Sequence, residues 1–344
     1  MCKLTEINSA KQIEAIPEQA LAWHQEGRGA VLATVIQTWG SAPRRIGGQM
    51  AISGQGDMAG SVSGGCVEGA VVLEALEALS AGEIKVLEYG ISDGDAFAVG
   101  LACGGTIRVL LEPVGAVLSE PLLAELVAAR AARQPMVYCV NCETGANALH
   151  AHGYEERMRL DRSGFEPDGN TFVSVHNPKL RLIIVGAVHI AQALVPMAEL
   201  AGFDVYLIDP RGSFGSIERF PNHQIIEEWP DQALCDLQLD ARSALVLLTH
   251  DPKLDDPALQ VGLGSKAYFI GALGSTRTHH ARVERFLSLG FSRAQIDRIH
   301  GPVGLPIGAA TPAEIAASIL AQIIPALRLL GWYLMSFLLA PLKA

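Results

Sequence analysis

The sequence has few basic residues, and this shortage excludes one class of partner. Lysine and arginine number 26 against 36 aspartates and glutamates, which gives a formal net charge of -10 at pH 7. A chain with that balance is not a nucleic-acid binder as a whole, because it lacks the positive field that attracts phosphate backbones. Any anionic ligand must therefore be held by a few local groups.

Cysteine is also scarce, and its spacing excludes the common structural zinc sites. The six cysteines contain no C-x-x-C…C-x-x-C framework. Cys139 and Cys142 form a single C-x-x-C where a strand runs into a turn, with no second pair nearby. Ordinary packing is favoured there over a redox or metal role, and the second reading stays open.

An apolar run long enough to span a membrane is missing as well. Residues 1–17 are polar and amphipathic with no apolar signal core, so a cytoplasmic location is expected. Residues 329–342 carry no charge, but they are shorter than the ~20 residues that a membrane span needs. A buried or dimer-covered terminal helix is favoured, and a membrane or partner-docking role is the alternative.

The bulk composition is that of a globular protein of about two domains. The chain has 344 residues, of which 49% are hydrophobic and 18% are charged. We find no internal repeat. The expected organisation is a smaller mixed α+β domain over 1–140, a linker with short strands over 141–179, a Rossmann-like α/β domain over 180–328 and an apolar extension over 329–344.

The second half opens with a βαβ pattern. "RLIIVGAVHIAQALVPMAELAGFDVYLIDPR" reads as an apolar strand, a tight turn, a helix and a second strand that ends at Asp209. This pattern predicts a doubly wound parallel sheet. The dinucleotide fingerprint is incomplete, because its middle glycine is replaced by Val188, whose branched side chain should crowd a pyrophosphate. Asp209 is either the ribose-binding acid or a turn residue.

Ligands of such sheets bind at the carboxyl ends of the strands. That rule places Gly186, Asp209, His250 with Asp251, and 271–277 along one rim. His189 follows the first turn. His279 and His280 are adjacent and could in principle bind a metal ion, but their spacing matches no standard zinc pattern.

The first half carries two loops with anion-binding character. "TWGSAPRRIGGQM" places Arg44 and Arg45 after a buried strand, and arginine suits phosphate because its planar donors bind oxygen pairs. A solvated surface pair is the alternative. "SVSGGCVEGA" runs into a helix, so Ser61, 63–65 and the helix start offer hydroxyls and free backbone N–H groups to an anion.

A thiol stands at the mouth of that second loop. A helix start lowers a cysteine pKa, so Cys66 is a candidate thiolate, and Glu68 is expected to temper that effect or to cap the helix. "LACGGTIRV" places Cys103 before Gly104 and Gly105 in the same way. Two such cysteines with two arginines suit a ligand that combines phosphate with soft sulfur or metal chemistry. For each cysteine the alternative is a small buried residue.

Together these stretches resemble the XdhC/CoxI family. "TWGSAPRRIGGQM", "GSVSGGCVEGA" and "GLACGGTIRVLLEP" look like its N-terminal domain, and "LIIVGAVHIAQAL", "LTHDPKLDDPAL" and "YFIGALGSTRT" look like its Rossmann domain. The resemblance covers about residues 15–328. It departs from the family at Val188, where the turn usually reads G-A-G-H.

The resemblance implies an accessory protein for molybdenum hydroxylases such as xanthine dehydrogenase. It would hold molybdenum cofactor (molybdopterin) while a cysteine desulfurase supplies the sulfido ligand, and then pass the cofactor to the hydroxylase apoenzyme. It also implies a homodimer. Cys66 and Cys103 are the candidate molybdenum contacts. The full set expected to bind the cofactor is Arg44, Arg45, Ser61, Ser63, Gly64, Gly65, Cys66, Cys103, Gly104, Gly105, Gly186, His189, Asp209 and His250.

Two hypotheses compete. The favoured one is a cofactor chaperone without turnover of its own. The alternative is an NAD(P)-dependent oxidoreductase that uses the Rossmann rim, and Val188 and the lack of a hydride-transfer acid–base set argue against it. A membrane-tethered scaffold would rest on the apolar tail alone.

Overall fold

A computed structural model describes residues 15–40, 44–90, 105–212, 218–221 and 223–328. The chain divides into two compact units, Met1–Pro178 and Lys179–Ala344. The apolar stretch 329–344 lies outside the described residues. Among the helices that the structure describes, none is long and apolar enough to cross a membrane.

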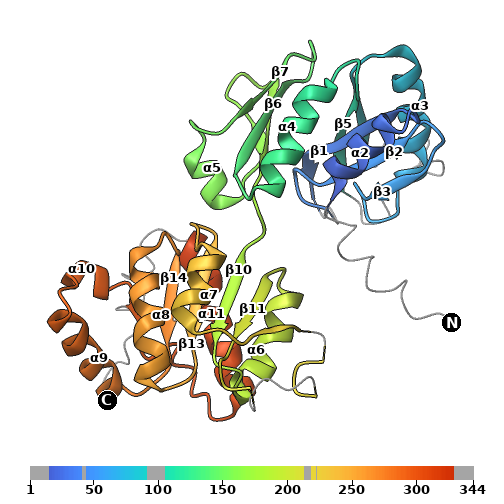
Figure 1. The fold of residues 1–344 in the computed structure, drawn as a ribbon. Helices are drawn as coiled ribbons and strands as arrows, with labels where there is room; N and C mark the ends of the chain where they lie inside the picture. The colour runs from blue at the N-terminus through green and yellow to red at the C-terminus, as the bar shows by residue number, and fades with distance from the viewer. Residues whose placement is uncertain (1–14, 41–43, 91–104, 213–217, 222, 329–344) are drawn as a thin grey trace. The chain divides into compact units, whose positions relative to one another are not determined.

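An antiparallel sheet of five strands forms the centre of unit 1, in the order β3-β2-β1-β5-β4 (Figure 1). Its strands are β1 Ala30–Trp39, β2 Gln49–Ser53, β3 Met58–Gly60, β4 Lys85–Tyr89 and β5 Thr106–Pro113. Its helices are α2 Ile16–Gln25, α3 Glu68–Ala81 and α4 Glu120–Ala131.

Strand β1 is buried on both faces, as its β-branched sequence predicts. Leu32 packs in a cluster with α2 and α4, whereas Val31 and Val35 pack in a second cluster with α3. Helix α3 therefore covers one face of the sheet. It ends at Gly82, whose φ of 69° is the left-handed cap that the sequence predicts.

A second sheet of unit 1 occupies much of the segment expected as a linker. It has four antiparallel strands in the order β7-β6-β9-β8. Its elements are β6 Met136–Asn141, β7 Asn147–His150, α5 Glu155–Leu160, β8 Gly164–Phe165 and β9 Thr171–His176. The structure differs from the expectation here, because β6 begins before 141 and pairs with β7 and β9, so this segment is part of unit 1.

The two cysteines of the C-x-x-C, Cys139 in β6 and Cys142 just after it, pack in two different apolar clusters. Cys139 is buried beside Val137 and Val173, and Cys142 packs against the α2–α4 cluster. Burial raises the pKa of both thiols, that of Cys142 to about 11. Both are free thiols in the part of the chain that the structure describes. Their surroundings are those of packing residues.

Unit 2 is the predicted doubly wound fold. Six parallel strands lie in the order β12-β11-β10-β13-β14-β15, the order of a dinucleotide-binding sheet. They are β10 Arg181–Val185, β11 Asp204–Ile208, β12 Ile225–Ile226, β13 Ser243–Leu247, β14 Phe269–Ala272 and β15 Ile299–His300.

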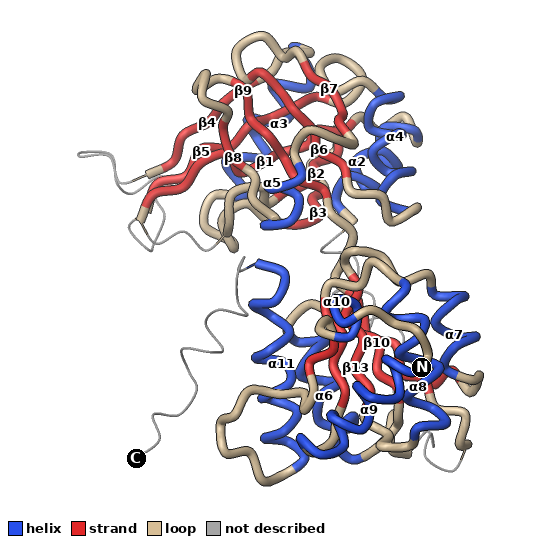
Figure 2. The backbone as a smooth tube through the Cα atoms, turned by 90° about the vertical axis from the view of Figure 1, so that its left-hand side faces the viewer, coloured by secondary structure: helices blue, strands red, loops and turns tan. Residues whose placement is uncertain are grey.

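Helices cover both faces of this sheet, as Figure 2 shows. Residues of α6 and α11 form one core with the strands, and residues of α7, α8 and α9 form the other. The helices are α6 His189–Leu200, α7 Pro230–Leu237, α8 Pro252–Gly264, α9 Thr276–Ser288, α10 Arg293–Ile296 and α11 Pro312–Arg328. The strand order changes direction between β10 and β13, where ligands of such folds bind.

Candidate functional site

The loop between β3 and α3 presents a thiol to solvent. Val62 and Ser63 are buried, and the chain then turns outward so that 64–66 are exposed. Gly64 and Gly65 have φ of 77° and 109°, conformations that favour glycine. Cys66 follows them two residues before the helix begins at Glu68.

The side chain of Glu68 turns back into this loop. Its Oε1 accepts hydrogen bonds from the N–H of Ser63 at 2.9 Å and of Val62 at 3.2 Å, and its Oε2 accepts from the N–H of Gly65 at 2.9 Å. The hydroxyl of Ser61 donates to Oε1 at 2.5 Å, and that of Ser63 donates to Oε2. Glu68 is only 6% exposed.

The other amides of the loop bind its two serines. The Cys66 and Val67 N–H groups donate to Ser63 Oγ at 3.0 and 2.9 Å, and the Gly64 N–H donates to Ser61 Oγ at 2.8 Å. The structure thus differs from the expectation of free N–H groups. The backbone N–H groups of 62–67 all donate to side chains of this loop or to Glu68.

Hydrogen bonding sets the charge state of Glu68. Burial by itself would raise the pKa of this carboxyl, but the hydroxyls of Ser61 and Ser63 and the Ser63 N–H lower it to about 2. Glu68 is therefore an anion at neutral pH. The loop is an anion-binding loop whose anion is part of the chain.

The two predicted loops of unit 1 meet. Arg44 Nε donates to the carbonyl oxygen of Ser61 at 2.9 Å, which joins the arginine loop to the start of the cysteine loop. Arg45 is exposed. The structure therefore brings at least one of the predicted arginines beside the loop that carries Cys66.

The third predicted motif is described only in part. Cys103 and Gly104 lie outside the described residues, and Gly105 is buried just before β5. Within the described ranges, no three His, Cys, Asp or Glu side chains are grouped so that they could hold a metal ion. The pairing of Cys66 with Cys103 stays a prediction.

At the rim of unit 2, Asp209, the predicted ribose-binding acid, already has hydrogen-bond partners within the chain. Asp209 is fully buried, and its Oδ2 accepts from the Ala187 N–H at 2.8 Å. Arg211 binds the same carboxylate with Nε and Nη2 at 2.9 and 2.8 Å. Burial would raise the pKa of Asp209, but Arg211 and the Ala187 N–H hold it below its ordinary value.

The remaining rim residues lie around the same turn. Gly186 has a φ of 112°, and a Cβ there would lie 2.7 Å from Thr249 Cγ2, so this glycine is required by the close approach of the chain after β13. His189 begins α6 and is exposed. His250 is exposed with a φ of 61°, and Asp251 caps α8. Two histidines thus reach solvent near the switch point.

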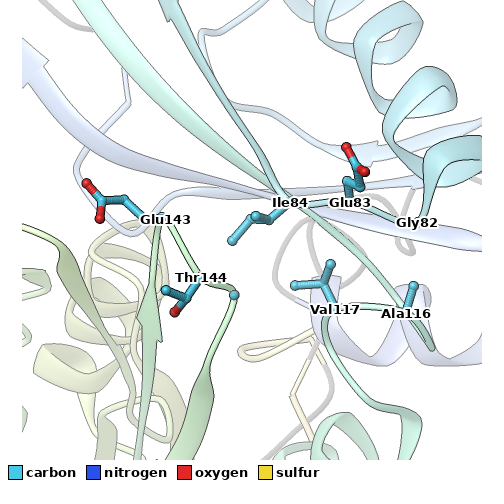
Figure 3. Close-up of a pocket in the computed structure, with 8 residues that line it drawn as sticks. Gly82, Glu83, Ile84, Ala116, Val117, Glu143 and Thr144 are labelled. Atoms are coloured by element: carbon cyan, nitrogen blue, oxygen red, sulfur yellow. The ribbon is translucent and has the colours of Figure 1, made fainter.

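A separate hollow of about 450 Å³ lies near the other end of α3 (Figure 3). Gly82, which follows α3, is one of its lining residues. The side chains of Glu83 and Glu143 lie on opposite sides of the hollow. The lining residues are Gly82, Glu83, Ile84, Ala116, Val117, Glu143, Thr144 and Gly145. Two carboxylates without a basic residue do not suit an anionic ligand.

Comparison with known proteins bears on both units. Residues 182–323 match the XdhC Rossmann domain, and residues 23–90 match the XdhC and CoxI family. A relative from Escherichia coli (strain K12), the "Molybdenum cofactor insertion chaperone PaoD", is 33% identical over 297 residues, which cover 86% of this chain and 83% of that protein. The chain belongs to the XdhC and CoxI family.

Two further relatives agree with this membership. A probable xanthine dehydrogenase subunit of Bacillus subtilis (strain 168) is 29% identical over 86% of this chain and 92% of that protein. A crystal structure of a xanthine dehydrogenase from Bacillus halodurans superposes with a TM-score of 0.66 at 27% identity, and the match covers 91% of this chain and 95% of that chain. The XdhC/CoxI resemblance that the motifs predict is confirmed.

Two residues of this XdhC and CoxI chain carry roles that sequence reasoning missed. Glu68 was expected to temper a helix dipole or cap the helix, whereas it accepts hydrogen bonds from much of the preceding loop. Arg211 was not singled out at all. The available signal was its place two residues after the strand-end acid, in "DPR".

Proposed function

We propose that this chain binds molybdenum cofactor and passes it to the apoenzyme of a molybdenum hydroxylase of the xanthine dehydrogenase type. Membership of the XdhC and CoxI family and the name of its Escherichia coli relative, a molybdenum cofactor insertion chaperone, support this proposal. The observation that carries it is the exposed Cys66 thiol on a hydrogen-bonded loop beside Arg44.

The residues of this site fit the cofactor, which is the cargo of the protein. Molybdenum cofactor is a pterin with a dithiolene-bound metal and a terminal phosphate, and it supplies a soft metal centre when bound. Arg44 and Arg45 suit the phosphate because guanidinium groups pair with phosphate oxygens. The thiol of Cys66 suits the soft metal. The same proposal assigns Cys103, from the glycine-rich motif later in the sequence, as a second sulfur contact.

The finer parts of the proposal rest on the family resemblance. They are sulfuration of the bound cofactor by a cysteine desulfurase, a homodimer and a cytoplasmic location. Co-purification with the desulfurase and with the hydroxylase apoenzyme, and the mass in solution by light scattering, test the first two. Fractionation of cells tests the third.

The alternative, an NAD(P)-dependent oxidoreductase, has less support. Its ribose hydroxyls would need acceptor positions on Asp209, and both oxygens of that carboxylate already bind Arg211 or the Ala187 N–H. Val188 replaces the glycine that admits a pyrophosphate. The chaperone is therefore the function that the site supports best.

The decisive experiment measures binding of molybdenum cofactor and binding of nicotinamide nucleotides to the same protein. The protein is incubated with free molybdenum cofactor, passed through gel filtration and assayed for molybdenum and pterin, while NADH and NADPH are titrated into a second sample. We expect near-stoichiometric molybdenum and pterin without nicotinamide binding. Tight nicotinamide binding without molybdenum would overturn the proposal.

Replacing Cys66 with serine should reduce cofactor retention several-fold and leave the fold intact. Serine keeps the size of the side chain but loses the soft sulfur donor, and the exposed position costs little stability. Cys235→Ser is the matched control, since Cys235 is an exposed thiol in unit 2. Molybdenum per chain after gel filtration is the measurement. If Cys66→Ser retains as much molybdenum per chain as Cys235→Ser, Cys66 is an ordinary surface residue and not a cofactor contact.

Restoring the fingerprint glycine should not create NADH binding. In Val188→Gly the steric obstacle is gone, but Asp209 stays saturated by Arg211 and the Ala187 N–H. Isothermal titration of NADH into the wild type and the variant should show no saturable binding in either. Binding that appears in Val188→Gly alone would identify Val188 as the deciding residue and reopen the oxidoreductase hypothesis.

A further inference from the structure

The carboxylate of Glu68 has the donor set that an anion-binding loop offers to a ligand. Three backbone N–H groups and two hydroxyls converge on its two oxygens. Phosphate-binding loops use the same groups, namely amides and hydroxyls before a helix start. In this loop the carboxylate of Glu68 occupies the position that a ligand anion would take.

We propose that Glu68 is a built-in anion that orders loop 61–67 and positions the Cys66 thiol, so that the loop amides are closed to an external phosphate. The assignment of Cys66 as a cofactor contact rests on the proposed function. The ordering of the loop by Glu68 does not.

The connection from Glu68 to Cys66 runs through Ser63. The hydroxyl of Ser63 donates to Glu68 Oε2, and its oxygen accepts from the N–H groups of Cys66 and Val67. Ser63 is fully buried, so its rotamer is fixed by these three bonds. Glu68 thereby fixes the backbone at Cys66 without needing to touch the thiol. It is a positioning residue.

The same bonds decide where a phosphate can bind. All N–H groups from 62 to 67 have partners in the chain, so a phosphate at this loop would have to displace a buried carboxylate from five donors. The second anion would also meet the negative charge of Glu68. The guanidinium groups of Arg44, which contacts this loop, and of its neighbour Arg45 carry positive charge and are the better binding groups.

Chemical rescue tests the built-in anion. In Glu68→Ala the cradle is empty, and added formate, a carboxylate without a side chain, should enter it. The first readout is hydrogen exchange of 62–67, where we expect amide protection to fall at least ~10-fold in the variant and to return with formate. Chloride at equal ionic strength is the salt control. Glu77→Ala, on the solvent side of the same helix, is the matched variant control.

The second readout is the rate of Cys66 alkylation by iodoacetamide at one fixed pH, followed on the cysteine peptide. Without Glu68 the backbone at Cys66 is no longer held through Ser63, so the alkylation rate should rise in Glu68→Ala and return with formate. Glu68→Gln, which keeps the size and loses the charge, should show the same rise in rate without rescue by formate. It also replaces the alanine variant if that one fails to fold.

Unchanged protection of 62–67 in both variants, or protection lost in Glu68→Ala without any response to formate, would overturn the proposal. Neither readout involves molybdenum cofactor, so the result is independent of the proposed function. Molybdenum retention by Glu68→Gln is then measured separately. A disturbed loop with normal retention would support the role of Glu68 and contradict the assignment of Cys66 as a cofactor contact.

Discussion

Replacing Asp255 with leucine is expected to lower the free energy of unfolding of unit 2 by ~3–5 kcal/mol. Asp255 and Arg282 are each 2% exposed, and Oδ2 of the one lies 3.5 Å from Nη2 of the other. Removing the carboxylate leaves a guanidinium buried without its counter-charge. Urea unfolding followed by circular dichroism measures the loss.

This pair also joins two turns of the rim. The hydroxyl of Thr249, after β13, donates to Asp255, and Arg282 Nη2 donates to the carbonyl oxygen of Leu273, after β14, at 3.2 Å. Among the described residues, Nε and Nη1 of Arg282 are buried without a hydrogen-bond partner. Burial raises the pKa of Asp255 and lowers that of Arg282, so burial opposes both charged forms and the attraction between the two side chains favours them.

A double variant separates the lost pair from lost packing. Asp255→Leu with Arg282→Met removes both charges, and we expect most of the stability to return, because no unpaired charge remains. Asp256→Asn is the neighbouring control. Its ion pair with Arg285 is partly exposed, so the expected loss is about 1 kcal/mol or less. A double variant that is as unstable as Asp255→Leu alone would contradict an electrostatic origin.

Strong local patterns predicted most of the fold. The Rossmann unit follows from apolar strands alternating with amphipathic helices, and this pattern is hard to satisfy in another way. In unit 1 the β-branched run 30–38 and Gly82 predicted a strand and a helix end within one or two residues. The segment 141–178 was harder, because strands such as β8, of two residues, carry almost no periodicity.

The sequence predicted a loop rich in hydrogen-bond donors before α3, but not the group that those donors bind. Serines and glycines before a helix indicate an anion-binding loop, and the structure has one. Its anion is Glu68, and backbone N–H groups carry no sequence signature that tells an internal carboxylate from an external phosphate. A glutamate in the first helical turn commonly serves as a cap. Whether it caps one amide or accepts from several loop donors is decided by tertiary packing.

The Rossmann acid illustrates the same limit. Asp209 stands directly after β11, where a ribose-binding acid stands in the fingerprint, and its position was predicted correctly. Arg211, two residues later, takes both of its oxygens. Spacing alone does not reveal this, because the pairing depends on the path of the turn after β11.

Acid should remove a measurable part of the stability of unit 1 through Glu68. Its folded-state pKa of about 2 lies below the ordinary value of 4.5, so ionisation stabilises the folded state by ~3 kcal/mol above the ordinary pKa. The contribution is present above pH ~4.5 and is lost as the pH falls through ~2. Between pH 5 and pH 3 the loss from this group is about 2 kcal/mol.

Comparison with Glu68→Gln isolates this contribution from the other carboxyl groups. Glutamine has no charge to titrate, so the difference in unfolding free energy between wild type and variant should shrink by about 2 kcal/mol from pH 5 to pH 3. Urea unfolding followed by tryptophan fluorescence suits this unit, because Trp23 is buried in its core. Glu77→Gln, on the exposed side of α3, should follow the wild type at each pH. A constant difference between wild type and Glu68→Gln would mean that the charge of Glu68 is not what the loop amides stabilise, and its carboxyl would then act by shape alone.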